Sequence, residues 1–201
     1  MSFLALALLP LGIVAGAVTT LAGQGGGLLL VLALSAFVGP HAALALTTPA
    51  LFLGNAHRAW LCRKLVDRRL AWLTIAGVLP GAYLGGRFAG LASPAVLQWA
   101  LVLVTALAIG KALRWLTLEV PRGAFVPAGA GIGILAGTSG GAGVLLGPLV
   151  HSSGLRGSAF VGTVAVIAVA LHAGRLLAYG GAGLLKVCLL YTSPSPRDRT
   201  R

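Results

Sequence analysis

The sequence is poor in acidic residues: its 201 residues include only three Asp or Glu, against 15 Lys or Arg. Two of the three acids, Asp67 and Glu119, fall in loops between long apolar segments. The apolar segments contain no paired carboxylates, no Ser/His/Asp arrangement and no metal-type spacing of Cys and His. This shortage predicts that the protein is not an enzyme, uses no metal or cofactor, and does not carry Na⁺ or a metal cation.

Charged residues are also rare overall, at 9% of the chain, while 58% of the residues are hydrophobic. A soluble domain of this size could not bury so much apolar surface, so the sequence predicts that the bilayer is its solvent. The net charge of +12 could suggest nucleic acid. However, the basic residues lie mostly at segment ends and in short loops, where they orient membrane proteins, and form no basic face. We therefore predict contact with lipid and no binding of nucleic acid.

The end of the chain differs from the rest. Residues 188 to 198 resemble one reading frame of a translated sequencing adapter, so we interpret 188–201 as a non-native tail; a natural polar tail is the alternative. Without Arg197, Arg199, Arg201 and Asp198, 12 basic and 2 acidic residues remain, a net charge of +10. Cys62 is then the only cysteine, so no disulfide is expected. We also expect that two further helices, about 50 residues, are missing after residue 187.

Runs of apolar residues predict an all-α fold, a polytopic transmembrane helical bundle. The expected segments are 3–21, 28–38, 41–60, 70–91, 95–116, 123–137 with 144–150, and 158–179. Segment 28–38 is too short to cross about 30 Å of hydrocarbon, so it either dips in and returns or is part of a tilted crossing. Gly81 and Gly85 form a small-residue face that suits close helix packing. Loops 61–69 and 117–123 are basic and therefore cytoplasmic, which places the N-terminus outside.

Two glycine-rich turns interrupt the apolar segments, one at residues 21–27 and one at residues 135–143. A helix tolerates such turns poorly, because each glycine costs up to about 1 kcal/mol relative to alanine. At membrane depth, irregular backbone persists only where protein buries it or where it lines a wet cavity. Broken helices at matching places in two halves are typical of a transporter's substrate site. The alternative interpretation is that these glycines only permit close helix packing.

The two turns belong to an internal repeat with an offset of 114 to 117 residues. The pairs are Leu21-Ala22-Gly23 with Leu135-Ala136-Gly137, Thr47 with Thr163, His57 with His172, and Arg58 with Arg175. We predict a first repeat over 1–116 and an incomplete second repeat over 123–187. Each repeat has an odd number of net crossings, so the two face opposite ways, as in many secondary transporters.

The polar groups of the segments are mainly hydrogen-bond donors without a carboxylate, which predicts a site for an oxyanion. The predicted substrate-binding residues are Gly23, Gln24, Gly25, Gly26, Thr47, Asn55, His57, Thr138, Ser139, Gly140, Thr163 and His172. For His57 and His172 a structural alternative remains open. Both could lie at helix ends in the interface, with Arg58 and Arg175 extending to lipid headgroups.

These motifs resemble the sulfite exporter TauE/SafE family of membrane transporters. The resemblance is carried by Gly23 to Leu30, Ala42 to Pro49, Pro80 to Gly86, and Gly147-Pro148-Leu149; Val31 departs from it, where a proline often follows the first turn. The resemblance implies a multi-pass protein of the bacterial inner membrane that exports small sulfur-containing anions such as sulfite or organosulfonates. A passive anion channel and a non-transporting membrane scaffold are the alternatives, and a homo-oligomer is a possible assembly.

Overall fold

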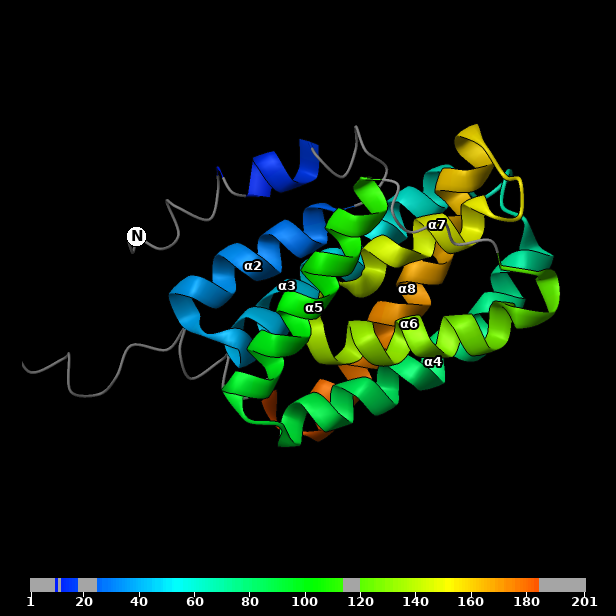
Figure 1. Cartoon of the computed structure of the whole chain (residues 1–201). Coiled ribbons are helices and arrows are strands. Elements are labelled where there is room, and N and C mark those ends of the chain that lie inside the picture. Colours follow the sequence, from blue (N-terminus) through cyan, green and yellow to red (C-terminus); the bar gives the residue numbers. More distant parts are fainter. Residues whose placement is uncertain (1–9, 11, 18–24, 114–119, 185–201) are drawn as a thin grey trace, which may run out of the picture.

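The computed structural model describes residues 10, 12–17, 25–113 and 120–184. Every regular element in these ranges is a helix (Figure 1), which confirms the predicted all-α class. The elements are α2 (Gly26–Val38), α3 (Pro40–Leu61), α4 (Arg68–Leu91), α5 (Pro94–Ala112), η1 (Arg122–Ala124), α6 (Phe125–Ser139), η2 (Ala142–Leu145), α7 (Leu146–His151) and α8 (Gly157–Gly181).

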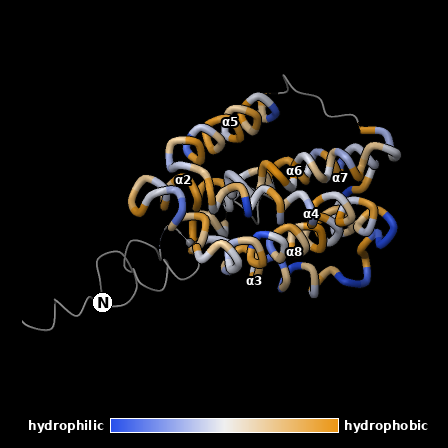
Figure 2. The backbone as a smooth tube through the Cα atoms, turned by 90° about the horizontal axis from the view of Figure 1, so that it is seen from below, coloured by the Kyte–Doolittle hydropathy of each residue, from blue (hydrophilic) through white to orange (hydrophobic). Residues whose placement is uncertain are grey.

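Helix α8 lies between α3 and α4. Helices α3 and α4 both pack against it, α2 packs on α3, and α6 lies along α4, an arrangement visible in Figures 1 and 2. Within the described residues, only α5 and α8 are both long enough and apolar enough to cross a membrane by composition alone. The two helices differ in burial. Within the 18-residue apolar stretch of each helix, 56% is buried inside the protein in α8 and 17% in α5. Helix α5 is therefore peripheral.

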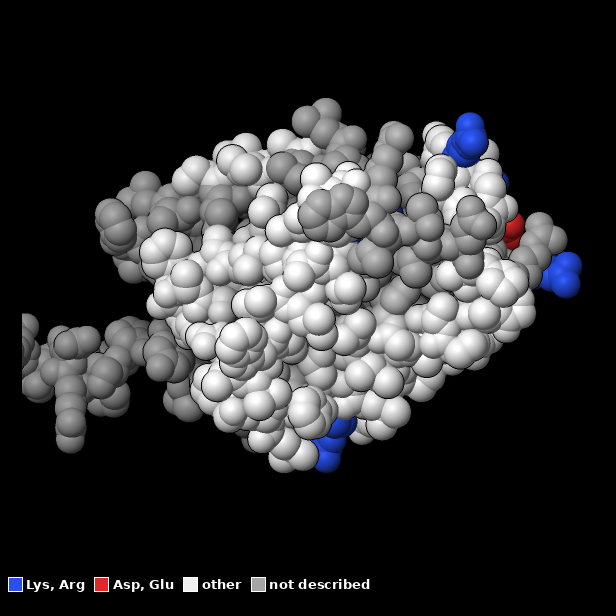
Figure 3. Space-filling view, viewed as in Figure 1, with Lys and Arg blue, Asp and Glu red and all other residues white. Residues whose placement is uncertain are grey.

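The outer surface is largely apolar. Large side chains such as Leu53, Trp72, Leu84 and Trp99 are exposed on α3, α4 and α5. In Figure 2 the hydrophilic stretches lie mostly at bends of the chain, and apolar stretches run along the helices. The face in Figure 3 shows Lys and Arg only near its right-hand end and at its lower edge. An apolar surface of this extent is expected where lipid replaces water around the protein.

Helices α4 and α6 approach each other through glycines on both sides. Each helix contributes three glycines spaced four residues apart. Those of α4 are Gly77, Gly81 and Gly85, and they face Gly129, Gly133 and Gly137 of α6. A Cβ on any of these six would collide with a backbone carbonyl of the other helix. Small residues let helix backbones meet closely in lipid, where apolar side chains give no solvent-driven association. The predicted packing face at Gly81 and Gly85 is confirmed.

Three connections lie together at one end of the bundle. Asp67, Gly123 and Ser153 line a single cavity there, and the Asp67 N–H donates to Thr163 Oγ1 over 3.0 Å. The Asp67 carboxylate accepts from the Leu70 N–H at 3.0 Å and so caps α4. This end, called the basic end below, carries Arg63, Lys64, Arg68, Arg69 and Arg156.

The opposite end is defined by the start of α3 and the end of α4. His41 Nε2 lies 3.2 Å from the Ala92 carbonyl oxygen, which joins the α2–α3 turn to the α4–α5 turn. Gly90 faces Ala182, so the C-terminal end of α8 is here as well. Helices α3, α4 and α8 therefore each run the full length between the two ends.

Candidate functional site

The two glycine turns meet inside the bundle. Helix α6 ends at Ser139 and is followed by Gly140, which has φ of 76°, and α2 begins after Gly25, which has φ of 106°. Glycine adopts these left-handed conformations without the steric cost that a Cβ imposes. The turns are in contact, because a Cβ on Gly141 would collide with the Leu28 side chain. The α6–η2 turn thus packs on the first turn of α2.

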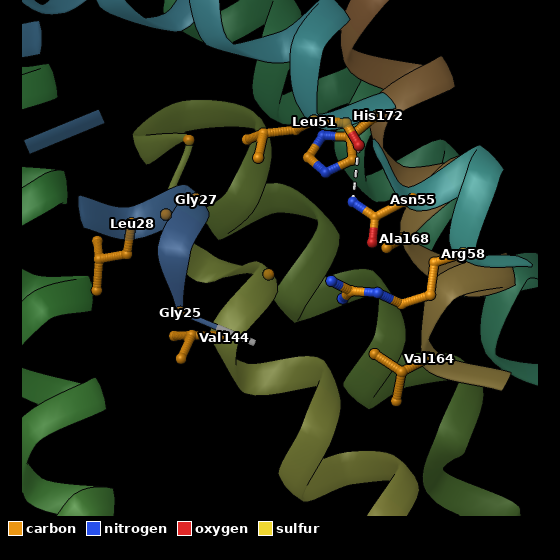
Figure 4. Close-up of a pocket in the computed structure, with 13 residues that line it drawn as sticks. Gly25, Gly27, Leu28, Leu51, Asn55, Arg58, Val144, Val164, Ala168 and His172 are labelled. Carbon is orange, nitrogen blue, oxygen red and sulfur yellow. Dashed lines mark hydrogen bonds between the residues drawn. The ribbon is translucent and has the colours of Figure 1, made fainter. Parts of the chain in front are cut away.

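A cavity of about 60 Å³ lies between these turns and the helices α3 and α8 (Figure 4). A water molecule needs about 10–15 Å³ of such space, so several waters or one small anion would fit. The lining residues are Gly25, Gly27, Leu28, Leu51, Asn55, Arg58, Gly140, Gly141, Gly143, Val144, Val164, Ala168 and His172. We call this cavity the turn pocket.

Three polar side chains from α3 and α8 face the turn pocket. Figure 4 shows the Arg58 guanidinium extending from α3 into the space beside Ala168, with Asn55 and His172 nearby. One Asn55 N–H donates to the Leu51 carbonyl at 2.7 Å. At the other wall, the N-terminus of α2 is directed at the pocket through Gly25 and Gly27. The first N–H groups of a helix have no intrahelical partner, so this wall has positive character.

Behind the pocket wall lies Arg175, with none of its side chain exposed. Its Nη1 donates to His172 Nδ1 at 3.3 Å and to the Gly140 carbonyl at 3.4 Å. Its Nε donates to the Tyr179 hydroxyl at 3.3 Å, and that hydroxyl donates to the Gly137 carbonyl at 2.6 Å. Arg175 and Tyr179 therefore fasten the end of α6 and its turn to α8.

The arginine also determines the hydrogen-bonding state of His172. A guanidinium has donors only, so the His172 Nδ1 that it contacts must act as an acceptor. The ring proton is then on Nε2, and the imidazole is uncharged. Because His172 lines the turn pocket, the wall includes an imidazole that is a donor through Nε2.

The family model for sulfite exporter TauE/SafE matches residues 8–193, almost the whole chain and all the helices described above. The chain belongs to the sulfite exporter TauE/SafE family. This confirms the family that the sequence motifs resemble and makes the protein an integral membrane transporter by family. No match was found among curated proteins or among solved structures. The matched range ends within 188–201, where the non-native tail stays a prediction.

In this member of the sulfite exporter TauE/SafE family, four predicted site residues come together at the turn pocket: Gly25, Asn55, Gly140 and His172. Gly26 is buried next to Gly25 but does not line the cavity. His57 is exposed on the outer side of α3 and does not face the pocket. The remaining predicted residues of the first turn, Gly23 and Gln24, lie outside the described residues.

The predicted hydroxyl groups are engaged elsewhere. Thr47 donates to the Ala43 carbonyl at 2.8 Å, Thr138 to Ile134 at 3.0 Å and Ser139 to Leu135 at 2.7 Å, so each bonds one turn back on its own helix. The Thr163 hydroxyl accepts a hydrogen bond from the Asp67 N–H at the basic end. None of the four lines the turn pocket in this structure.

Sequence reasoning missed Arg58 as a pocket residue. The signal was present in the helical spacing, since residues at i, i+3 or i+4 share a face. Leu51, Asn55 and Arg58 follow that spacing on α3, as do Val164, Ala168 and His172 on α8, whereas His57 is out of phase. The alternative in which Arg175 extends to lipid headgroups is wrong, because that side chain is buried.

Proposed function

We propose that this member of the sulfite exporter TauE/SafE family is a secondary transporter that exports small sulfur-containing oxyanions, and that the turn pocket binds them. The observation that carries the proposal is the chemistry of the wall. Arg58, the His172 Nε2–H and the amides at the start of α2 are all donors. Among the described residues the only carboxylate, Asp67, caps α4 at the basic end. Donors without a competing carboxylate favour a sulfite or sulfonate group.

Alternating access needs two gates, which many secondary transporters build from inverted repeats, and the backbone supports such a relation here. Gly25 and Gly140 have positive φ and are 115 residues apart; Gly39 and Gly154 also have positive φ and are 115 residues apart. This spacing agrees with the offset of 114 to 117 found in the sequence. The first repeat, 1–116, would then contribute α2 to α5, and the second, 123–187, would contribute α6 to α8.

The directions of the two hairpins support the same mechanism. The α6–η2–α7 hairpin starts and finishes at the basic end, because Gly123 and Ser153 line one cavity there. Helix α2 runs from the turn pocket to the opposite end, where it leads into α3. The two turns therefore approach the pocket from opposite ends, as gates on either side of one central site do.

The location of the turn pocket suits loading from the cytoplasm. Basic loops mark the cytoplasmic side of a membrane protein, so we assign the basic end to the cytoplasm and the N-terminus to the exterior. Arg58 lies one turn before the end of α3 at Leu61, and Val164 lies two turns after the start of α8 at Gly157. The pocket thus extends toward the basic end, where an exporter takes up its substrate.

Replacing Arg58 tests the proposal in proteoliposomes that contain the whole chain. Arg58→Gln removes a charge-assisted hydrogen bond worth about 1.5–3 kcal/mol, so we expect sulfite efflux at low concentration to fall about tenfold or more. Arg156→Gln is the matched control, because Arg156 is exposed at the basic end and does not line the pocket. Efflux is measured with a sulfite-sensitive dye.

The same assay separates the competing functions. A transporter shows flux that saturates with sulfite and is driven by a counter-ion gradient, whereas a passive channel shows neither. A scaffold shows no flux and no shift in unfolding temperature with any anion. Wild-type flux in the Arg58→Gln protein would overturn the assignment of the pocket.

A further inference from the structure

Arg175 is a buried charge with unused hydrogen-bonding capacity. Three of the five N–H groups of its guanidinium donate to Tyr179, Gly140 and His172, while Nη2 has no partner among the described residues. No carboxylate of the described chain lies beside it, since Asp67 is at the basic end. An ionised side chain inside a membrane protein without a counter-charge is costly, and such residues mark ion and substrate pathways.

The position of this charge relates it directly to the turn pocket. Its Nη1 contacts His172 and Gly140, and both of these residues line the cavity. An anion bonded to the His172 Nε2–H would lie roughly 8 Å from the guanidinium, which is two hydrogen-bond lengths plus about 2 Å across the imidazole ring. Buried charges at such a separation are poorly screened by salt, so the guanidinium acts strongly on the occupant of the pocket.

The charges near the pocket can be counted. Arg58 contributes one positive charge at the wall and Arg175 a second one behind it. His172 is uncharged, because its Nδ1 accepts from Arg175. The other described lining residues are glycines, apolar residues and Asn55. A singly charged occupant would leave one positive charge uncompensated, whereas an occupant with two negative charges would neutralise the site.

We propose that Arg175 is a specificity-determining residue: together with Arg58 it makes the turn pocket select doubly charged oxyanions over singly charged ones of similar shape. It acts without contacting the anion, through its charge and by holding His172 with the proton on Nε2. The inference rests on the proposed function, because it assumes that the turn pocket is the anion site. The preferred substrate class is a doubly charged oxyanion such as sulfite in its fully deprotonated form, and chloride-like and monosulfonate ions bind more weakly.

The competing explanation is that Arg175 is only a structural brace for the α6–η2 turn. A brace would affect all ligands of the pocket equally, because its loss would loosen the turn whatever the ligand charge. A selecting charge affects the two classes differently. The ratio of affinities for a dianion and a monoanion therefore distinguishes the roles, and it does so even when the variant is less stable than the wild type.

The test measures binding of sulfate, a dianion, and methanesulfonate, a monoanion of similar shape, to the whole chain in detergent by calorimetry. We expect the wild type to bind sulfate about tenfold or more tightly than methanesulfonate. Arg175→Gln should lower the sulfate affinity about tenfold and the methanesulfonate affinity only about threefold, because the Coulomb energy is proportional to the ligand charge, so that the preference narrows about threefold. Arg175→Lys, which keeps the charge, should retain the preference, and Arg156→Gln should behave like the wild type.

If the wild-type protein binds sulfate and methanesulfonate with equal affinity, the inference is overturned, and no variant is needed to show it. Equal losses for both anions in Arg175→Gln would overturn it too and identify a brace. The proposed function has a separate criterion. If Arg58→Gln abolishes sulfite flux while the sulfate preference does not depend on Arg175, only this inference fails. If Arg58→Gln leaves flux and binding unchanged, the pocket itself is wrongly assigned.

Discussion

Gly140→Ala is expected to lower sulfite flux about a hundredfold. Alanine at a left-handed position costs about 1–2 kcal/mol, and Gly140 has φ of 76°. Its Cβ would also collide with the Leu44 side chain and come within 3.1 Å of Arg175 Nη2. Overpacking of this kind adds about 1–3 kcal/mol. Because Gly140 lines the turn pocket and its carbonyl bonds Arg175, the strain would displace the pocket wall itself.

Gly154→Ala provides the control for backbone strain. Gly154 also has positive φ, at 88°, but a Cβ there meets nothing within 4 Å, and the residue lies at the basic end. This variant should lose about 1 kcal/mol of stability and keep near wild-type flux. Flux is compared at equal amounts of reconstituted protein. Equal flux in the Gly140 and Gly154 variants would show that the α6–η2 turn is not part of the transport site.

Gly133→Leu is expected to prevent assembly of the bundle. A Cβ at this position would lie 2.5 Å from the Val78 carbonyl oxygen and 2.8 Å from the Ala82 nitrogen, both of them backbone atoms of α4. Backbone cannot move aside as a flexible side chain can, so α4 and α6 would separate along their shared glycine face. We expect a loss of at least about 4 kcal/mol, which leaves little folded protein.

The measurement is the amount of monodisperse protein recovered in detergent, together with its unfolding temperature. Gly131→Leu is the matched control, because Gly131 is on the same helix, is exposed, and a Cβ added there would meet nothing within 4 Å. That variant should be recovered at the wild-type level. If both variants are recovered equally well, the close approach of α4 and α6 does not hold the bundle together.

Local patterns in the sequence predicted much of the fold. The glycine turns could be located because consecutive glycines disfavour helix wherever they occur, and the structure places Gly25 and Gly140 at left-handed positions there. The packing face at Gly81 and Gly85 followed from a spacing of four residues. Long apolar runs predicted helices because a membrane-embedded backbone must satisfy its own hydrogen bonds.

The candidate site was predicted less completely, for physical reasons. A hydroxyl in an apolar segment can bond a carbonyl one turn back, as Thr47 and Ser139 do, and the residue type alone does not reveal this. The choice between His57 and Arg58 depends on the rotation of α3 about its axis, which its neighbours determine. The burial of Arg175 depends on α6 and α8 meeting, a tertiary contact without a local signal.

The most direct measurement is an experimental structure of the whole chain with selenate, an oxyanion whose selenium gives an anomalous X-ray signal. We predict one strong anomalous peak in the turn pocket, between Gly25 and Gly140, within hydrogen-bond distance of Arg58 or His172. A peak found only among the arginines of the basic end, with the turn pocket holding no selenium, would contradict this prediction.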